Sequence, residues 1–138
     1  MYEKLTKYLD TIASDAIGNW IIDRENDGTI EHPIQMPYVS YSELVEHFID
    51  DVYYFIKNHN EMGLNRYVDI LNEYGIEWGT KSMTDVDADA LDVRCIMALI
   101  VGAVRLERFC DGALLGFFKS GTISKWLKRL RELERDGD

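Results

Sequence analysis

The segment Cys95–Val104, CIMALIVGAV, restricts the fold more than any other part of this sequence. Its ten residues carry no charge in a chain that is 29% charged. A helix that crosses a bilayer needs about 20 apolar residues, so this segment is too short to span a membrane, and we expect no membrane association. It is typical of a helix buried in a protein core. The length of 138 residues fits one domain, which we expect to cover residues 1–138.

Apolar residues that recur at helical spacing predict further helices around this core helix. Ser40 and Glu43 match a capping box at the start of one of them. The core helix itself is expected to be the longest, over 85–110, with Asp85, Asp87 and Asp89 near its positive N-terminal end. The predicted helices cover residues 3–13, 40–58, 64–74, 85–110, 112–119 and 122–134.

The region 19–38 differs, because it contains both prolines and a short β-prone run at Trp20. Asp27-Gly28 between short apolar runs predicts a small hairpin near residues 20–35. The stretch Asp23–Glu31 also matches the first positions of a calcium loop, but Ile34 stands where the bidentate glutamate is required. A solvated hairpin is therefore favoured over calcium binding. The predicted fold class is all-α or nearly so, with about five helices around the central apolar helix.

The two cysteines, Cys95 and Cys110, fall on the core helix and at its end. Fifteen residues of helix separate two Cα atoms by roughly 20 Å, whereas a disulfide needs them within about 7 Å. We expect free thiols, which fits a reducing cytoplasm. The charged start, MYEKLTKYLD, does not resemble a signal peptide, and this also favours a cytoplasmic location.

One candidate polar cluster lies on the predicted helix over 40–58. Glu43, His47 and Asp51 are spaced four residues apart, and Asp50 lies beside them, opposite the apolar face. This spacing could present several metal ligands on one helix face. The favoured interpretation is an ordinary solvated face, since charge on the polar side of a helix is common. No metal site is therefore expected.

A second candidate cluster lies at the end of the core helix, where Arg105, Glu107, Arg108 and Asp111 are close in sequence. Arg108 and Asp111 are three residues apart and could pair. We expect this cluster to fix the helix junction; a pocket for a carboxylate or phosphate is the alternative. Cys110 follows Phe109 and is expected to be a small core residue, although nearby arginines could activate its thiol.

Two motifs in the final third carry a family resemblance: Arg108–Gly112, RFCDG, and Ser120–Ile123, SGTI. With Pro37-Tyr38 and the helix that begins near Tyr41, this pattern resembles a family of bacterial proteins known only as a domain of unknown function. The resemblance implies a single compact bacterial domain. It implies no activity and no site residue.

The charge balance guides the functional expectation. There are 25 acidic and 15 basic residues, so the net charge of −10 argues against direct binding of nucleic acid. Residues 1–118 have a net charge of −12, and residues 119–138 have a net charge of +2. The basic last helix could therefore dock on the acidic body of a second copy, giving a homodimer.

The favoured function is a non-enzymatic binding or regulatory protein with a protein partner. One specific version is an acidic inhibitor of a nucleic-acid-binding protein, of the kind encoded on mobile elements. The alternative is a small metal-dependent hydrolase that uses the face with His47. No phosphate loop and no Gly-x-Gly-x-x-Gly motif is present, so no cofactor is expected.

Overall fold

The fold is mostly α-helical and is built around one buried helix, as the sequence predicts. The structure, a computed structural model, describes residues 1–12, 17–21 and 38–136. Helix α6 (Val93–Leu106) lies at its centre, and every residue of Cys95–Val104 is buried. Leu99 and Ile100 both have 0% exposure. Across the described ranges, no helix is both long and apolar enough to cross a membrane.

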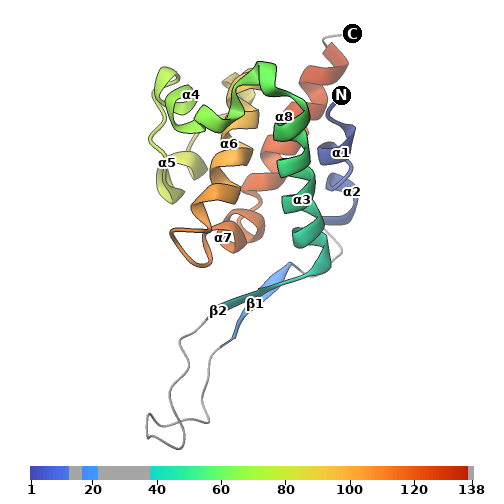
Figure 1. The fold of residues 1–138 in the computed structure, drawn as a ribbon, viewed down its shortest axis with the longest axis vertical. Helices are drawn as coiled ribbons and strands as arrows, with labels where there is room; N and C mark the ends of the chain where they lie inside the picture. Colours follow the sequence, from blue (N-terminus) through green and yellow to red (C-terminus); the bar gives the residue numbers. More distant parts are fainter. Residues whose placement is uncertain (13–16, 22–37, 137–138) are drawn as a thin grey trace, which may run out of the picture.

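Four helices pack directly on α6 and form the body of the molecule (Figure 1). Each turns an apolar face toward the centre, and the four together bury α6 over Cys95–Val104. The burial of α6 on all sides explains why its sequence shows an unbroken apolar run rather than an amphipathic pattern. The four are α3 (Glu43–Asn58), α4 (Tyr67–Glu73), α7 (Ala113–Lys119) and α8 (Thr122–Asp136).

The remaining helices are short. The predicted helix over 3–13 is instead two pieces, α1 (Glu3–Thr6) and α2 (Leu9–Ile12), and both pack on α8. Helix α5 (Thr80–Thr84) packs on α7. Three 3-10 turns complete the described helices: η1 (Asn60–Met62), η2 (Leu64–Arg66) and η3 (Ala88–Ala90).

The central helix begins later than predicted. The segment 85–92 is a loop with the short turn η3, so Asp85, Asp87 and Asp89 lie before the helix and not in its first turn. Asp92 is the residue that starts α6, because its side chain accepts a hydrogen bond from the backbone N–H of Cys95 at 3.0 Å. The longest helix is α3, not α6.

A two-stranded antiparallel hairpin projects from one end of the helical body (Figure 1). Strand β1 (Gly18–Ile21) pairs with β2 (Tyr38–Tyr41), with Gly18 opposite Tyr41. The expected hairpin is present, but its second strand lies further along the chain than predicted. The proposed Asp27-Gly28 turn and the Asp23–Glu31 loop lie outside the described residues.

This pairing corrects the predicted start of α3. Ser40 belongs to β2 and pairs with Asn19, so it does not cap the helix. Ser42 occupies the N-cap position, and its side chain makes no capping hydrogen bond. A local capping pattern was therefore overridden by strand pairing, which requires a partner from a distant part of the chain.

Candidate functional site

The loop between α6 and α7 is organised by one carboxylate, that of Glu107. It accepts hydrogen bonds from the backbone N–H groups of Gly112 at 3.1 Å and Leu114 at 3.0 Å. The same carboxylate accepts a third hydrogen bond from the hydroxyl of Tyr41. Glu107 thus satisfies backbone donors at the start of α7, where no preceding carbonyl is available.

The hydroxyl of Tyr41 links the hairpin to this loop. While it donates to Glu107, it accepts a hydrogen bond from the backbone N–H of Leu115 at 3.0 Å. Burial raises the pKa of Tyr41, and the hydrogen bond to the Glu107 carboxylate raises it further. The hydroxyl therefore stays protonated as a donor at neutral pH, and β2 is fixed to the first turn of α7.

The loop held in this way displays four consecutive exposed side chains, those of Arg108, Phe109, Cys110 and Asp111. Phe109 is 76% exposed, the largest fraction among the exposed large apolar residues of the described chain. Beside the loop lies Trp20 of β1, which is 46% exposed. We call these five residues the junction surface.

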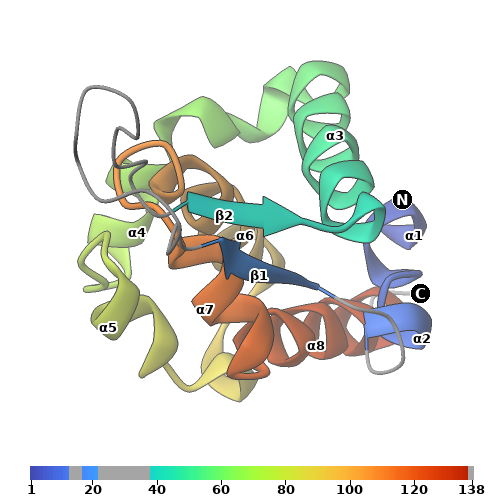
Figure 2. The ribbon, with the colours of Figure 1, turned by 90° about the horizontal axis from the view of Figure 1, so that it is seen from below.

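Trp20 can approach the loop because Gly112 has no side chain. A Cβ atom added at Gly112 would overlap the indole ring, and the positive φ of 87° at this residue also favours glycine. Figure 2 shows the two strands lying across this end of the bundle, in front of α6 and α7. The hairpin therefore forms one edge of the junction surface.

Aromatic rings extend inward from the junction surface. The ring of Phe109 meets that of Trp78 edge-on, with centroids 5.8 Å apart, and Trp78 meets Tyr67 at 5.4 Å. The indole N–H of Trp78 donates to the carbonyl of Gly102 at 3.0 Å, which fixes it against α6. Phe109 thus stands on a fixed support, although its own ring is largely in solvent.

The two arginines of the predicted cluster share one aromatic ring. The guanidinium carbons of Arg105 and Arg108 lie 5.2 Å and 5.9 Å from the ring centroid of Tyr53 on α3. The suggested pairing of Arg108 with Asp111 is wrong, since no ion pair joins them in the described part of the chain. The Nε of Arg105 is buried, and no residue in the described ranges forms a hydrogen bond with it.

The two cysteines differ in their surroundings, and both are free thiols, as predicted. Cys95 is buried in the first turn of α6, and this burial raises its pKa to about 11. Cys110 is exposed, so its predicted place in the core is wrong. It lies at a crevice of about 340 Å³ that is also lined by Thr80, Thr84 and Ser120.

The candidate residues on α3 are not brought together with a further cluster. Glu43, His47 and Asp50 are exposed on the outer side of the helix. Asp51 instead contacts the N-terminal segment: it accepts a hydrogen bond from the hydroxyl of Tyr8 and lies 3.5 Å from the ammonium of Lys7. Within residues 1–12, 17–21 and 38–136, no three potential metal ligands lie close enough to share an ion.

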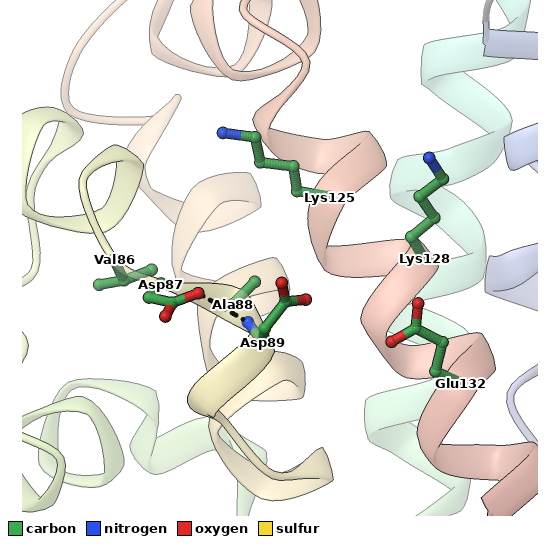
Figure 3. A pocket seen from close by; sticks show the side chains of 7 residues that line it. All are labelled: Val86, Asp87, Ala88, Asp89, Lys125, Lys128 and Glu132. Atoms are coloured by element: carbon green, nitrogen blue, oxygen red, sulfur yellow. Dashed lines mark hydrogen bonds between the residues drawn. The ribbon is translucent and has the colours of Figure 1, made fainter.

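A second crevice, of about 420 Å³, separates the loop containing η3 from α8. Figure 3 shows Asp87 and Asp89 on one wall, and Lys125, Lys128 and Glu132 on the other. The side chains that line it are mostly exposed. This crevice contains none of the residues predicted from the sequence as site candidates.

The basic side of α8 is only partly available to a partner. Leu91 accepts a hydrogen bond from Nε of Arg129 at 3.0 Å, and Thr6 accepts one from the guanidinium of Arg131 at 3.0 Å, both through their backbone carbonyls. Two of the basic side chains of α8 therefore fix this helix to its neighbours. Lys125 and Lys128 remain exposed.

Glu107 was placed from the sequence in a cluster expected to fix the helix junction, but the backbone N–H groups of α7 and the hydroxyl of Tyr41 were not identified as its hydrogen-bond partners. The available signal was an acidic residue a few positions before Gly112, which precedes a helix. The roles of Tyr41, Tyr53 and Trp20 had no comparable signal, because these residues come from other elements.

Comparison with known proteins gives one partial match. No curated protein and no solved structure matches this chain. Residues 74–136 match the model of a family of unknown function (DUF6508). They include α5 to α8 and the junction loop but not the hairpin, α3 or α4. This segment of the chain is therefore similar to a family without an assigned activity, in agreement with the resemblance noted from its motifs.

Proposed function

We propose that this chain is a non-enzymatic protein-binding module that contacts its partner through the junction surface. The observation that carries the proposal is Phe109, an aromatic side chain that is 76% exposed on a loop fixed from within by Glu107. Covering such a side chain contributes roughly 1.5–3 kcal/mol. Interfaces are enriched in aromatic residues and arginine, and the same surface contains Arg108, which precedes Phe109, and Trp20, which lies against Gly112.

Preorganisation supports the same proposal. The loop is held by hydrogen bonds to Glu107, and the ring of Phe109 rests on Trp78. A partner that binds here does not have to order the loop, so less conformational entropy opposes association. An exposed aromatic residue on such a support is typical of a binding anchor.

The charge distribution supports a partner with a basic surface. Residues 61–92 contain eight acidic and two basic residues, and all eight acidic residues are exposed. Together with the net charge of −10, they favour rapid encounter with a basic protein. A nucleic-acid-binding protein has such a surface, so an acidic inhibitor of one is the specific form of this proposal.

The test is capture of partners from cells that express the chain, using wild type, Phe109→Ala and Tyr54→Ala. Tyr54 is a matched control, because it is 52% exposed but lies on α3, away from the junction loop. We expect a protein that binds wild type and Tyr54→Ala but is lost with Phe109→Ala. Equal melting temperatures of the three proteins would show that folding is unchanged.

A salt series on the captured pair tests the charge argument. Screening acts over roughly 10 Å at 0.1 M salt, so the association rate should fall as salt rises. A partner retained by Phe109→Ala would place the interface elsewhere. An association rate that does not respond to salt would contradict the basic partner.

A further inference from the structure

We propose that Arg105 and Arg108 form a binding site for a single carboxylate from an acidic side chain of the partner, whose neighbouring apolar side chain packs on Phe109. This inference rests on the proposed function and specifies the chemistry at the edge of the junction surface. It follows from three observations on the described residues: the two guanidiniums contact one aromatic ring, neither forms an ion pair there, and one has a donor without an acceptor.

The two guanidiniums contact the same aromatic ring. Their carbons lie 5.2 Å and 5.9 Å from the ring centroid of Tyr53, and Arg108 follows Arg105 by three residues, just past the end of α6. Two like charges in this arrangement repel each other. An anion between them removes the repulsion and provides oxygen acceptors that match the planar donors of arginine.

The nearby acidic groups do not fill this role. The carboxylate of Glu107 is directed to α7 and Tyr41. Asp111 forms no ion pair with either arginine in the ranges that the structure describes. The absence is notable because acidic residues outnumber basic ones by 25 to 15 in this chain.

Arg105 provides an independent sign of an absent acceptor. Its Nε is buried and has no hydrogen-bond partner among the described residues, although the residue as a whole is partly exposed. Leaving a buried donor unsatisfied is unfavourable, especially on a charged group. A carboxylate at this guanidinium would restore part of the missing hydrogen bonding after a small movement of the side chain.

The charge of the whole chain selects the kind of anion. A net charge of −10 repels ligands with many negative charges, such as nucleic acids and polyphosphates. One carboxylate on an otherwise basic or neutral protein avoids this repulsion. Phe109 follows Arg108 directly in the chain and its ring is 76% exposed, so we assign the apolar side chain next to that carboxylate to this ring.

The test uses the full chain and two capped dipeptides, Ac-Asp-Phe-NH2 and its amide isostere Ac-Asn-Phe-NH2. Binding is followed through the arginine Nε–H signals in NMR spectra. We expect the Asp peptide to shift the signals of Arg105 and Arg108 saturably in the millimolar range. The Asn peptide should bind about tenfold more weakly, because it lacks the charge-assisted hydrogen bonds.

Two variants and one anion complete the design. Arg108→Gln should weaken the Asp peptide about tenfold, whereas Arg135→Gln, which removes an exposed arginine near the end of α8, should leave it unchanged. Inorganic phosphate should bind more weakly than the Asp peptide. Equal binding of the Asp and Asn peptides, or tighter binding of phosphate, would overturn the carboxylate site.

This outcome is separable from the proposed function. If the Asp peptide fails but Phe109→Ala still loses the captured partner, the protein-binding function stands and the carboxylate site is wrong. If the peptide binds as expected but no partner depends on Phe109, the site is present and the proposed function is wrong.

Discussion

At both ends of α6, a carboxylate accepts hydrogen bonds from backbone N–H groups and from a tyrosine hydroxyl, but the surroundings of the two carboxylates differ. At the start, the carboxylate of Asp92 accepts a hydrogen bond from the N–H of Cys95 and from the hydroxyl of Tyr74, at 2.8 Å. Past the end, the carboxylate of Glu107 accepts backbone N–H groups of the next helix and the hydroxyl of Tyr41. Each is a carboxylate that caps a helix while a tyrosine ties it to another element.

The difference lies in burial and in distance along the chain. Tyr74 is 18 residues from Asp92, and their contact is exposed. Tyr41 is 66 residues from Glu107, and their contact is partly buried. The first arrangement stabilises a helix start locally, whereas the second unites the hairpin, α6 and α7. A surface loop can therefore be ordered from inside while its own side chains remain in solvent.

The largest expected difference between the two ends concerns their cysteines. A disulfide reagent should modify Cys110 at once, since it is exposed, and Cys95 at least about a thousandfold more slowly, since its reaction requires opening of the core. Thiol release followed by absorbance measures both rates. In Cys110→Ser the fast phase should disappear. Two equally fast thiols would mean that the start of α6 is open.

Truncating a buried side chain in the middle of α6 gives a reference value for the stability changes expected at its two ends. Leu99→Ala should lower the free energy of unfolding by about 2–5 kcal/mol, because its side chain has 0% exposure and its loss leaves a cavity. Urea denaturation measures this change. Leu133→Ala, at a partly buried position of α8, should cost less. An unchanged midpoint for both Leu99→Ala and Ile100→Ala would contradict the central position of α6.

Removing the two carboxylates compares the ends directly. Glu107→Ala should lower the free energy of unfolding by about 2–3 kcal/mol, since it leaves two backbone donors and the Tyr41 hydroxyl without their acceptor. Asp92→Ala should lower it by about 1 kcal/mol, the usual effect of losing an N-cap. Both are measured by urea denaturation. Equal losses of unfolding free energy in the two variants would mean that burial does not strengthen the hydrogen bonds of Glu107.

The smallest expected effect is alkaline destabilisation. Burial and a carboxylate partner raise the pKa of Tyr41, and the same two causes raise that of Tyr74. The unfolded chain loses these protons first, near about pH 10, so stability is present below that pH and declines as pH rises toward the folded pKa values. The free energy of unfolding between about pH 9 and pH 12 should fall less steeply in Tyr41→Phe than in wild type.

Tyr74→Phe is the matched comparison, and it should flatten the pH dependence less, because the Tyr74 contact is exposed. Tyr8 and Cys95 also have raised pKa values, but they remain in all three proteins and contribute equally. A steeper decline in Tyr41→Phe than in wild type would contradict the assigned direction.

The features that the sequence predicts well are those set by local composition. The uncharged run at 95–104 indicates the buried helix, and the spacing of Ile123, Trp126, Leu127 and Leu130 indicates the core face of α8. The all-α fold with a small hairpin follows from these patterns. A segment that buries an apolar surface shows this in its own sequence pattern, so the buried face can be predicted without knowing which elements cover it.

The features that were mispredicted depend on partners distant in sequence. Ser40 has the sequence pattern of a helix N-cap, but in the structure it belongs to β2 and pairs with Asn19. Cys110 was expected in the core because it follows Phe109, but Phe109 itself is exposed. The cluster that contains Glu107 was expected from its charged residues to fix the helix junction. The partners of Glu107, which include Tyr41, were not predicted, because a carboxylate's hydrogen-bond partners are fixed only when the elements meet.

The contact between Tyr41 and Glu107 also has a consequence for how the chain folds. It closes a stretch of 66 residues, and the N–H that Tyr41 accepts belongs to Leu115, 74 residues later. During synthesis from the N-terminus, β2 leaves the ribosome well before either partner exists. We expect the hairpin to dock late, after α6 and α7 have formed, since contacts between distant residues are slow to close. The junction surface would then be the last part of the molecule to reach its native shape.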